Sequence, residues 1–233
     1  MWDLQSQRQR RRVASLNAVI AEMLALRNPE GVAGMKRFGI FATNALGLST
    51  PQLRQIARTV GRDQQLAEEL WQSGIHDARI LASLVADPAA ISRATMDRWA
   101  ADFNSWDVCD ACSYQLFDCT PWAESKIRKW AKDRREFVRR AAFAIMAGKS
   151  VHDKKAPDEV FLAYLPLLEQ YAFDDRNFVR KAVNWALRAI GKRNAALCAA
   201  AIASAERIRA QNTAPARWIA ADALRELRAR QNK

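Results

Sequence analysis

Apolar residues in this chain recur every three or four positions, which is the spacing of one face of an α-helix. Near the N-terminus this apolar stripe comprises Leu16, Ile20, Met23 and Leu24. The stripe predicts a helix from about Leu4 to Arg27, which stops near Asn28-Pro29-Glu30-Gly31. No alternation typical of strands persists, and only 8 Gly and 7 Pro occur in 233 residues. The pattern therefore predicts an all-α protein.

A second helix is predicted from about Val32 to Asn44. The segment Gly47-Leu48-Ser49-Thr50-Pro51 then reads as a break followed by a new helix start. Thr50 is expected to cap that helix, and Pro51 suits its first position.

The middle and end of the chain contain an internal repeat. The segments Glu136–Ala142 and Asn177–Val183 align without gaps, 41 residues apart, and weaker echoes lie at 77–82 and 217–224. Repeats of about 40 residues are typical of stacked helix pairs. We therefore expect one domain over residues 1–233, an α-solenoid of HEAT-like repeats with a concave face. The polar segment Gly148–Pro157 is expected to be a surface loop between two repeats.

The charge of the chain favours an anionic partner. Lys and Arg total 37 against 25 Asp and Glu, which gives a net charge of +12. The basic pairs Arg139-Arg140 and Arg180-Lys181 fall near the starts of successive inner helices, where stacking would align them along the concave face. Nucleic acid is the expected partner, although solvated helix ends would show the same pattern. A further basic segment, residues 1–12, belongs to or precedes the first helix.

Neither a membrane span nor a secretory signal is predicted, so we expect a cytoplasmic protein with reduced thiols. Cys109 and Cys112 form a C-x-x-C motif that redox or zinc chemistry could use. A zinc site needs more ligands, and neither His76 nor His152 lies at finger-like spacing. We therefore expect cysteines that pack in the core and bind no metal. The histidines also lack a nucleophile at triad spacing.

Trp106 and Asp110 lie four residues apart in a predicted helix, so both project from one face. An electron-rich ring beside a carboxylate can hold a cation. Asp107 points about 100° away and is expected to be structural. The alternative is that the tryptophan packs in the core and the aspartate caps the helix. Core positions are expected for five other tryptophans: Trp71, Trp99, Trp122, Trp130 and Trp218.

Five marks together resemble the AlkD-type DNA alkylation repair glycosylases, which are built from HEAT-like repeats. In chain order they are Met35–Gly39, Gly47–Arg54, Trp106–Asp110, Phe137–Ala142 and Lys181–Arg188. The resemblance extends from about Met35 to Arg228. The segment Gly148–Pro157 is longer than expected for that family, and the N-terminal arginine cluster is not one of its marks.

The resemblance implies roles for individual residues. It makes Trp106, Asp110 and Trp185 catalytic, assigns a phosphate contact to Arg140 and places Phe38 near the lesion. It further implies a monomeric, cofactor-free glycosylase that hydrolyses the N-glycosidic bond of cationic N3- or N7-alkylated purines in duplex DNA. The DNA backbone would also be bound by the other members of the two basic pairs, Arg139, Arg180 and Lys181.

The chemistry of that reaction suits the residues. An alkylated purine is a good leaving group, and bond cleavage moves positive charge onto the sugar. A carboxylate about 4 Å from a unit cation gains about 4 kcal/mol at an effective dielectric near 20, so Asp110 is the expected stabiliser. Two alternatives stay open at this point: a HEAT-like nucleic-acid binder without activity, and a solenoid that binds an acidic protein.

Overall fold

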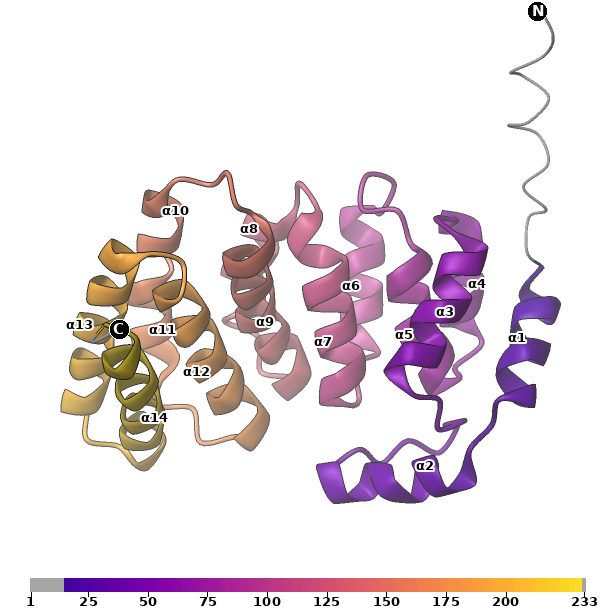
Figure 1. The fold of residues 1–233 in the computed structure, drawn as a ribbon, viewed down its shortest axis with the longest axis horizontal. Helices are drawn as coiled ribbons and strands as arrows, with labels where there is room; N and C mark the ends of the chain where they lie inside the picture. Colours follow the sequence, from indigo (N-terminus) through magenta and orange to yellow (C-terminus); the bar gives the residue numbers. More distant parts are fainter. Residues whose placement is uncertain (1–14, 232–233) are drawn as a thin grey trace, which may run out of the picture. The chain divides into compact units, whose positions relative to one another are not determined.

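The structure is a computed structural model, and it describes residues 15–231. Every regular element among these residues is a helix (Figure 1). The chain divides into two compact units, one up to Asp87 and the other from Pro88 onward.

The first unit is built from short helices around a buried aliphatic core. Its main packing is of α5 against α3 and α4, and Leu70, Leu81 and Val85 are fully buried there. The elements are α1 (Leu16–Ala25), α2 (Pro29–Met35), the 3₁₀ helix η1 (Lys36–Phe38), α3 (Thr50–Val60), α4 (Gln64–Gln72) and α5 (His76–Val85).

The first predicted helix is present, but it begins later than expected. Ser15 caps α1 by accepting a hydrogen bond from the Ala18 backbone N–H, and the helix runs from Leu16 to Ala25. The predicted portion before Ser15 and the basic segment 1–12 lie outside the described residues.

The second predicted helix, Val32–Asn44, is wrong at both ends. The helical segment starts at Pro29, capped by Asn28, and stops at Phe38. Gly39 then takes the left-handed conformation with φ of 75°, which turns the backbone out of the helix.

The capping residue of the third helix is also corrected. Ser49, and not Thr50, is the cap of α3, and it forms a reciprocal capping box with Gln52. Thr50 and Pro51 therefore occupy the first two helical positions, where a missing proline N–H costs nothing.

Gly47 is required by both its conformation and its surroundings. Its φ is 78°, and a Cβ there would collide with the Asn28 carbonyl oxygen and lie 2.8 Å from the Val32 backbone nitrogen. On either side of it, the backbone N–H groups of Leu46 and Leu48 donate to the buried Asp77 carboxylate at 2.6 and 2.7 Å. The glycine therefore lets this loop fold tightly against α2.

We expect Gly47→Ala to lower the free energy of unfolding by about 2–4 kcal/mol, measured by urea denaturation. The matched control is Gly74→Ala. Gly74 has a similar φ of 69°, but no heavy atom lies within 4 Å of the point that a Cβ would occupy. The control should therefore carry only the backbone cost of about 1–2 kcal/mol. Equal losses in the two variants would contradict the steric argument.

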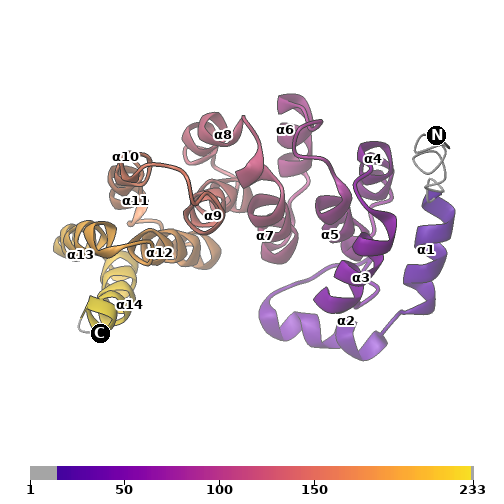
Figure 2. The ribbon, with the colours of Figure 1, turned by 45° about the horizontal axis from the view of Figure 1, so that its top comes forward.

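The second unit is a stack of helix pairs. Helices α7, α9, α12 and α14 pack in succession, while α8 packs against α9 and α13 packs against α12 and α14 (Figure 2). The elements are α6 (Arg93–Ala101), α7 (Trp106–Gln115), η2 (Phe117–Cys119), α8 (Ala123–Trp130), α9 (Glu136–His152), α10 (Asp158–Leu162), α11 (Leu165–Tyr171), α12 (Asn177–Gly191), α13 (Ala195–Ala210) and α14 (Ala214–Gln231).

The predicted repeat is confirmed. The two aligned segments form the first turns of α9 and α12, which begin at Glu136 and Asn177 and pack against each other. Phe137 and Phe178, equivalent in the repeat, place their ring centroids 5.5 Å apart. The fold is an all-helical α-solenoid of HEAT-like repeats.

The loop predicted from Gly148 is shorter than expected, because α9 continues to His152. Gly148 does not break this helix. It is buried, and a Cβ at this position would lie 2.7 Å from Oδ2 of Asp118. The glycine thus makes room for a carboxylate from η2, and the non-helical connection covers only Asp153–Pro157.

Most of the tryptophans predicted to be core lie there. Trp71, Trp99 and Trp130 are almost fully buried, and Trp122 is half-buried with its indole N–H donating to the Ile91 carbonyl. Trp218 was predicted wrongly, since its side chain is 38% exposed. Of the cysteines, only Cys119 is exposed, and the buried ones are Cys109, Cys112 and Cys198.

Asp97 connects α6 to α8 through three donors. Its carboxylate accepts from Lys126 at 2.8 Å, from Lys129 at 2.8 Å and from the Trp130 indole N–H at 3.0 Å. Burial acts to raise the pKa of Asp97, but these hydrogen bonds outweigh it and lower the pKa to about 2. The charged carboxylate therefore stabilises the folded state.

We expect Asp97→Asn to reduce stability at pH 7, because the lysines lose their counter-charge. A lowered folded-state pKa contributes stability that is complete above the unfolded value, about 4, and is lost as pH falls toward about 2. The difference between wild type and variant should therefore shrink over that window. Urea denaturation at a series of pH values measures it, and a constant difference would contradict the assigned ion pairs.

Candidate functional site

Helix α7 presents three candidate functional side chains on one face. Trp106, Asp110 and Tyr114 follow one another at four-residue spacing, and each is half-buried. The opposite face carries Val108 and Cys112 into the core. Sequence reasoning identified the first two and missed Tyr114, although the same spacing of four points to it.

Asp110 forms a bidentate ion pair with Arg140 of α9. The Nε and Nη2 atoms of Arg140 donate to Oδ1 and Oδ2 of Asp110 at 2.8 and 2.7 Å. Nη1 of the same guanidinium donates to the Phe178 carbonyl at 2.5 Å, at the start of α12. The Asp110 side chain is 19% exposed and that of Arg140 only 7%. The Asp110 side chain therefore keeps some contact with solvent, although both of its oxygens accept from Arg140.

Burial and pairing act in opposite directions on these charges. Burial raises the pKa of Asp110, and the Arg140 guanidinium opposes that rise. For Arg140, burial acts to lower the pKa, but the Asp110 carboxylate outweighs it and raises the pKa above its ordinary value. Each group thus depends on the other to remain charged in a poorly solvated place.

Trp185 of α12 contacts this face of α7 through Tyr114, and we call Trp106, Tyr114 and Trp185 the aromatic row. The two rings stack with centroids 5.3 Å apart and an interplanar angle of 29°, and Tyr114 meets His152 edge-on at 4.5 Å. Trp185 also lines a cavity of about 420 Å³ together with Lys154 and Lys192. The indole therefore lies between the α7 face and a basic opening.

The other predicted backbone-binding cations differ in accessibility. Arg139 donates to Asp174 at 2.6 Å, and its side chain is 14% exposed. Arg180 lies over the Trp218 ring at 5.1 Å from its centroid. Lys181 is the one exposed member of the four cations predicted on α9 and α12. A phosphate would have to displace Asp174 or Asp110 to reach Arg139 or Arg140.

The predicted phosphate contact of Arg140 stays a prediction. Its guanidinium donates to Asp110 through Nε and Nη2 and to the Phe178 carbonyl through Nη1. Phe38 belongs to the first unit, where it ends η1 with its side chain 68% exposed. Oδ1 of Asp107 accepts from the Val108 backbone N–H at 3.0 Å, and its predicted structural role stays a prediction.

Comparison with known proteins decides the family. Residues 19–227 match the family described as DNA alkylation repair enzyme. The chain belongs to this DNA alkylation repair family. No curated protein matches the sequence.

A solved structure supports the fold of this family member. It comes from a new family of proteins related to the HEAT-like repeat DNA glycosylases with affinity for branched DNA structures. It is 21% identical, the match covers 83% of each chain, and the TM-score is 0.72. No membrane-crossing helix is found among the described helices, since none combines the required length with sufficient apolar character.

Proposed function

We propose that the protein hydrolyses the N-glycosidic bond of cationic N3- or N7-alkylated purines in DNA, with Asp110 stabilising the sugar cation. The observation that carries this proposal is the Asp110 carboxylate itself. It is ion-paired, 19% exposed, and lies between Trp106 and Tyr114 on one helix face. A fixed negative charge beside aromatic rings is a suitable environment for a transient cation.

The reaction needs little from the protein besides this charge. When the N–C1′ bond breaks, its electron pair neutralises the alkylated base, and positive charge develops on the deoxyribose. Water then adds to C1′ and releases a proton. Asp110 attracts the developing cation, and its partly exposed carboxylate can orient that water because each oxygen can accept more than one hydrogen bond.

The ion pair limits how much Asp110 contributes. A carboxylate about 4 Å from the developing cation gains about 4 kcal/mol at an effective dielectric near 20, and a guanidinium about 7 Å away takes back about 2 kcal/mol. The net gain of about 2 kcal/mol corresponds to roughly 30-fold in rate. Arg140 nevertheless keeps the carboxylate ionised and aimed, so its role is one of positioning.

The aromatic residues supply a further cation-binding surface. The indoles of Trp106 and Trp185 each contribute about 0.5–2 kcal/mol toward a cation over the ring. Tyr114 supports Trp185 by stacking against it at 5.3 Å. We therefore assign Trp106 and Trp185 to the base or sugar and Tyr114 to positioning.

DNA binding itself draws on the exposed cations. Lys181 and Lys154 can contact phosphates, while Lys192 at the same opening beside Trp185 would first have to leave its ion pair with Glu226 of α14. Each phosphate contact should steepen the dependence of log affinity on log salt by about 0.9. A flat salt response would instead favour a solenoid that binds a protein.

The deciding experiment is base release. The full chain is incubated with duplex DNA carrying 7-methylguanine, and free base is quantified by chromatography against an enzyme-free control. Release above spontaneous depurination supports the proposal. No release under conditions in which the protein binds that DNA would refute it.

A second candidate is a DNA-binding protein without glycosylase activity. Two observations favour it: Arg140 occupies both oxygens of Asp110, and the solved structure described above belongs to a family with affinity for branched DNA. It predicts tighter binding to a four-way junction than to a duplex of equal length, together with no base release. If the protein binds the junction and the duplex with equal affinity and releases base, this second candidate is excluded and the glycosylase proposal stands.

A further inference from the structure

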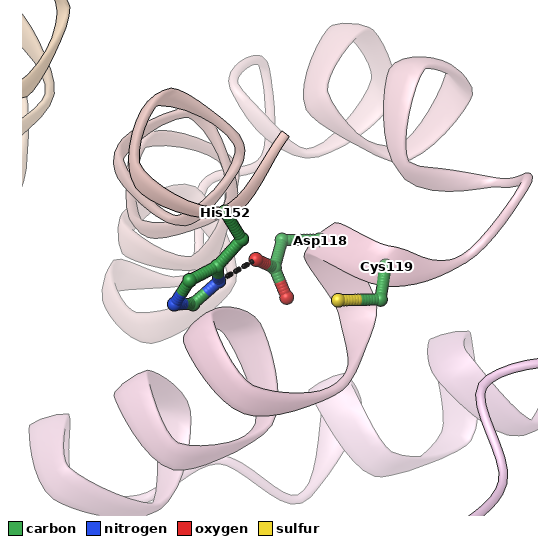
Figure 3. Close-up of side chains that lie close together, drawn as sticks. All are labelled: Asp118, Cys119 and His152. Atoms are coloured by element: carbon green, nitrogen blue, oxygen red, sulfur yellow. Dashed lines mark hydrogen bonds and ion pairs between the residues drawn. The ribbon is translucent and has the colours of Figure 1, made fainter. Parts of the chain in front are cut away.

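Asp118, Cys119 and His152 gather at one point beside the aromatic row. Their ligand atoms all lie within 4.8 Å of one another (Figure 3). Asp118 and Cys119 come from η2, and His152 is the last residue of α9. The Asp118 carboxylate lies between the other two, with Oδ2 2.6 Å from Nδ1 of His152 and the other oxygen turned toward the Cys119 sulfur.

The buried carboxylate is incompletely satisfied by the protein. The Asp118 side chain is fully buried, and its Oδ1 has no N–H or O–H donor among the described residues, with only the Cys119 thiol beside the carboxylate. A buried acceptor without a partner costs about 1–3 kcal/mol, and more when it carries charge. Both other groups are accessible, because Cys119 is exposed and the His152 side chain is 39% exposed. An ion can therefore reach the cluster from solvent.

The donor set is selective by its chemistry. One thiolate, one imidazole and one carboxylate are the ligands that Zn²⁺ takes in proteins, at about 2.0–2.3 Å. Sulfur disfavours Mg²⁺ and Ca²⁺, which prefer oxygen alone. Three protein ligands leave a fourth position, which here would face a cavity of about 520 Å³ lined in part by Thr120, Lys149 and Asp153.

We propose that Asp118, Cys119 and His152 form a binding site for Zn²⁺ or a similar borderline divalent metal, with the fourth position open to solvent. Binding would displace the proton between Nδ1 of His152 and Asp118, which moves to Nε2 of the same ring or to solvent, and would release the thiol proton of Cys119 to solvent. Tetrahedral geometry requires the Nδ1–Oδ2 separation to widen from 2.6 Å to about 3.3 Å. The exposed His152 side chain at the helix end can make that movement.

The sequence did not indicate this site. The spacing of the cysteines suggested zinc only for Cys109 and Cys112, and both of these are buried in the protein core. The cluster forms because the uninterrupted α9 carries His152 back to η2, with Gly148 making room for Asp118. The proposal does not depend on glycosylase activity.

Cobalt binding tests the proposal directly. The full chain, freed of metal with a chelator, is titrated with Co²⁺ and then with Zn²⁺. We expect a sulfur-to-cobalt charge-transfer band and the intense visible bands of tetrahedral cobalt, both removed by stoichiometric Zn²⁺. Cys119→Ser should abolish the charge-transfer band, and His152→Asn should weaken binding at least about tenfold.

Two variants serve as controls for this titration. Cys198→Ala removes a buried thiol on α13, and Asp153→Asn neutralises a carboxylate of the same cavity outside the cluster. Both should bind cobalt like wild type, with thermal unfolding showing that every variant is folded. Absence of a charge-transfer band in wild type, or an unchanged band in Cys119→Ser, would overturn the site. Neither outcome bears on base release, so the two proposals fail separately.

Discussion

Asp110→Asn is expected to lower the single-turnover rate of 7-methylguanine release by roughly a thousandfold, because the carboxylate attraction of about 4 kcal/mol is lost while the Arg140 charge remains. The variant removes the charge that opposes the sugar cation, while its amide oxygen can still accept a hydrogen bond from Arg140. Affinity for undamaged duplex should change less than about twofold, because Asp110 is not a backbone contact. Rate and affinity are measured on the same oligonucleotide with and without the lesion.

Asp107→Asn is the matched control for this measurement. It removes a carboxylate from the same helix, three residues earlier in the chain and on a different face. We expect it to excise at nearly the wild-type rate. If Asp110→Asn excises as fast as wild type, Asp110 is not the stabilising group. Equal losses in the two variants would mean that general surface charge, and not position, matters.

Arg140→Gln is expected to lower the free energy of unfolding by about 3–5 kcal/mol. It removes the partner of a largely buried carboxylate, and the hydrogen bond to the Phe178 carbonyl that links α9 to α12 is lost as well. Urea denaturation measures the change. The variant should also lose excision, since an unpaired Asp110 in this setting tends to take up a proton.

The double variant Asp110→Asn/Arg140→Gln separates pairing from packing. Neutralising both partners removes the isolated buried charge, so the pair of changes should cost less than the sum of the single ones. Arg135→Gln is the surface control, because Arg135 is 56% exposed in its pair with Asp133 and should cost less than about 1 kcal/mol. Additive losses would contradict a coupled ion pair.

Together these variants separate the effect on rate from the effect on stability. Each single variant should lower both the rate and the stability, because each leaves its partner buried without a counter-charge. The double variant should regain part of the stability but none of the rate, because the charge that attracts the sugar cation is still absent. A DNA-binding protein without activity would show the stability losses and no base release at any stage.

Local pattern determined much of this fold. The three-to-four residue period of apolar positions predicts helices because it depends only on neighbours within two turns. The 41-residue repeat predicts the pairing of α9 with α12 because equivalent segments stack in such arrays. Trp106 and Asp110 could be placed on one face for the same reason.

Errors arose where tertiary contacts override local preference. Gly148 reads as a helix breaker, yet it is the residue that lets α9 pass Asp118. Thr50 and Ser49 are both good caps, and the reciprocal bond with Gln52 selects Ser49. Trp218 was expected in the core, but α14 exposes it.

The sequence by itself determined that this chain is a helical repeat protein, and that an aromatic ring and a carboxylate share one helix face. Only the tertiary structure decided that Arg140 forms an ion pair with Asp110 and that the Tyr114 ring stacks on Trp185. It also decided that Asp118 and Cys119 lie close to His152. The physical reason is the separation along the chain of the residues that interact. Helix periodicity is set by residues a few positions apart, whereas these contacts join side chains some thirty or more residues apart. Their geometry follows from the packing of successive helices, which a local pattern does not encode.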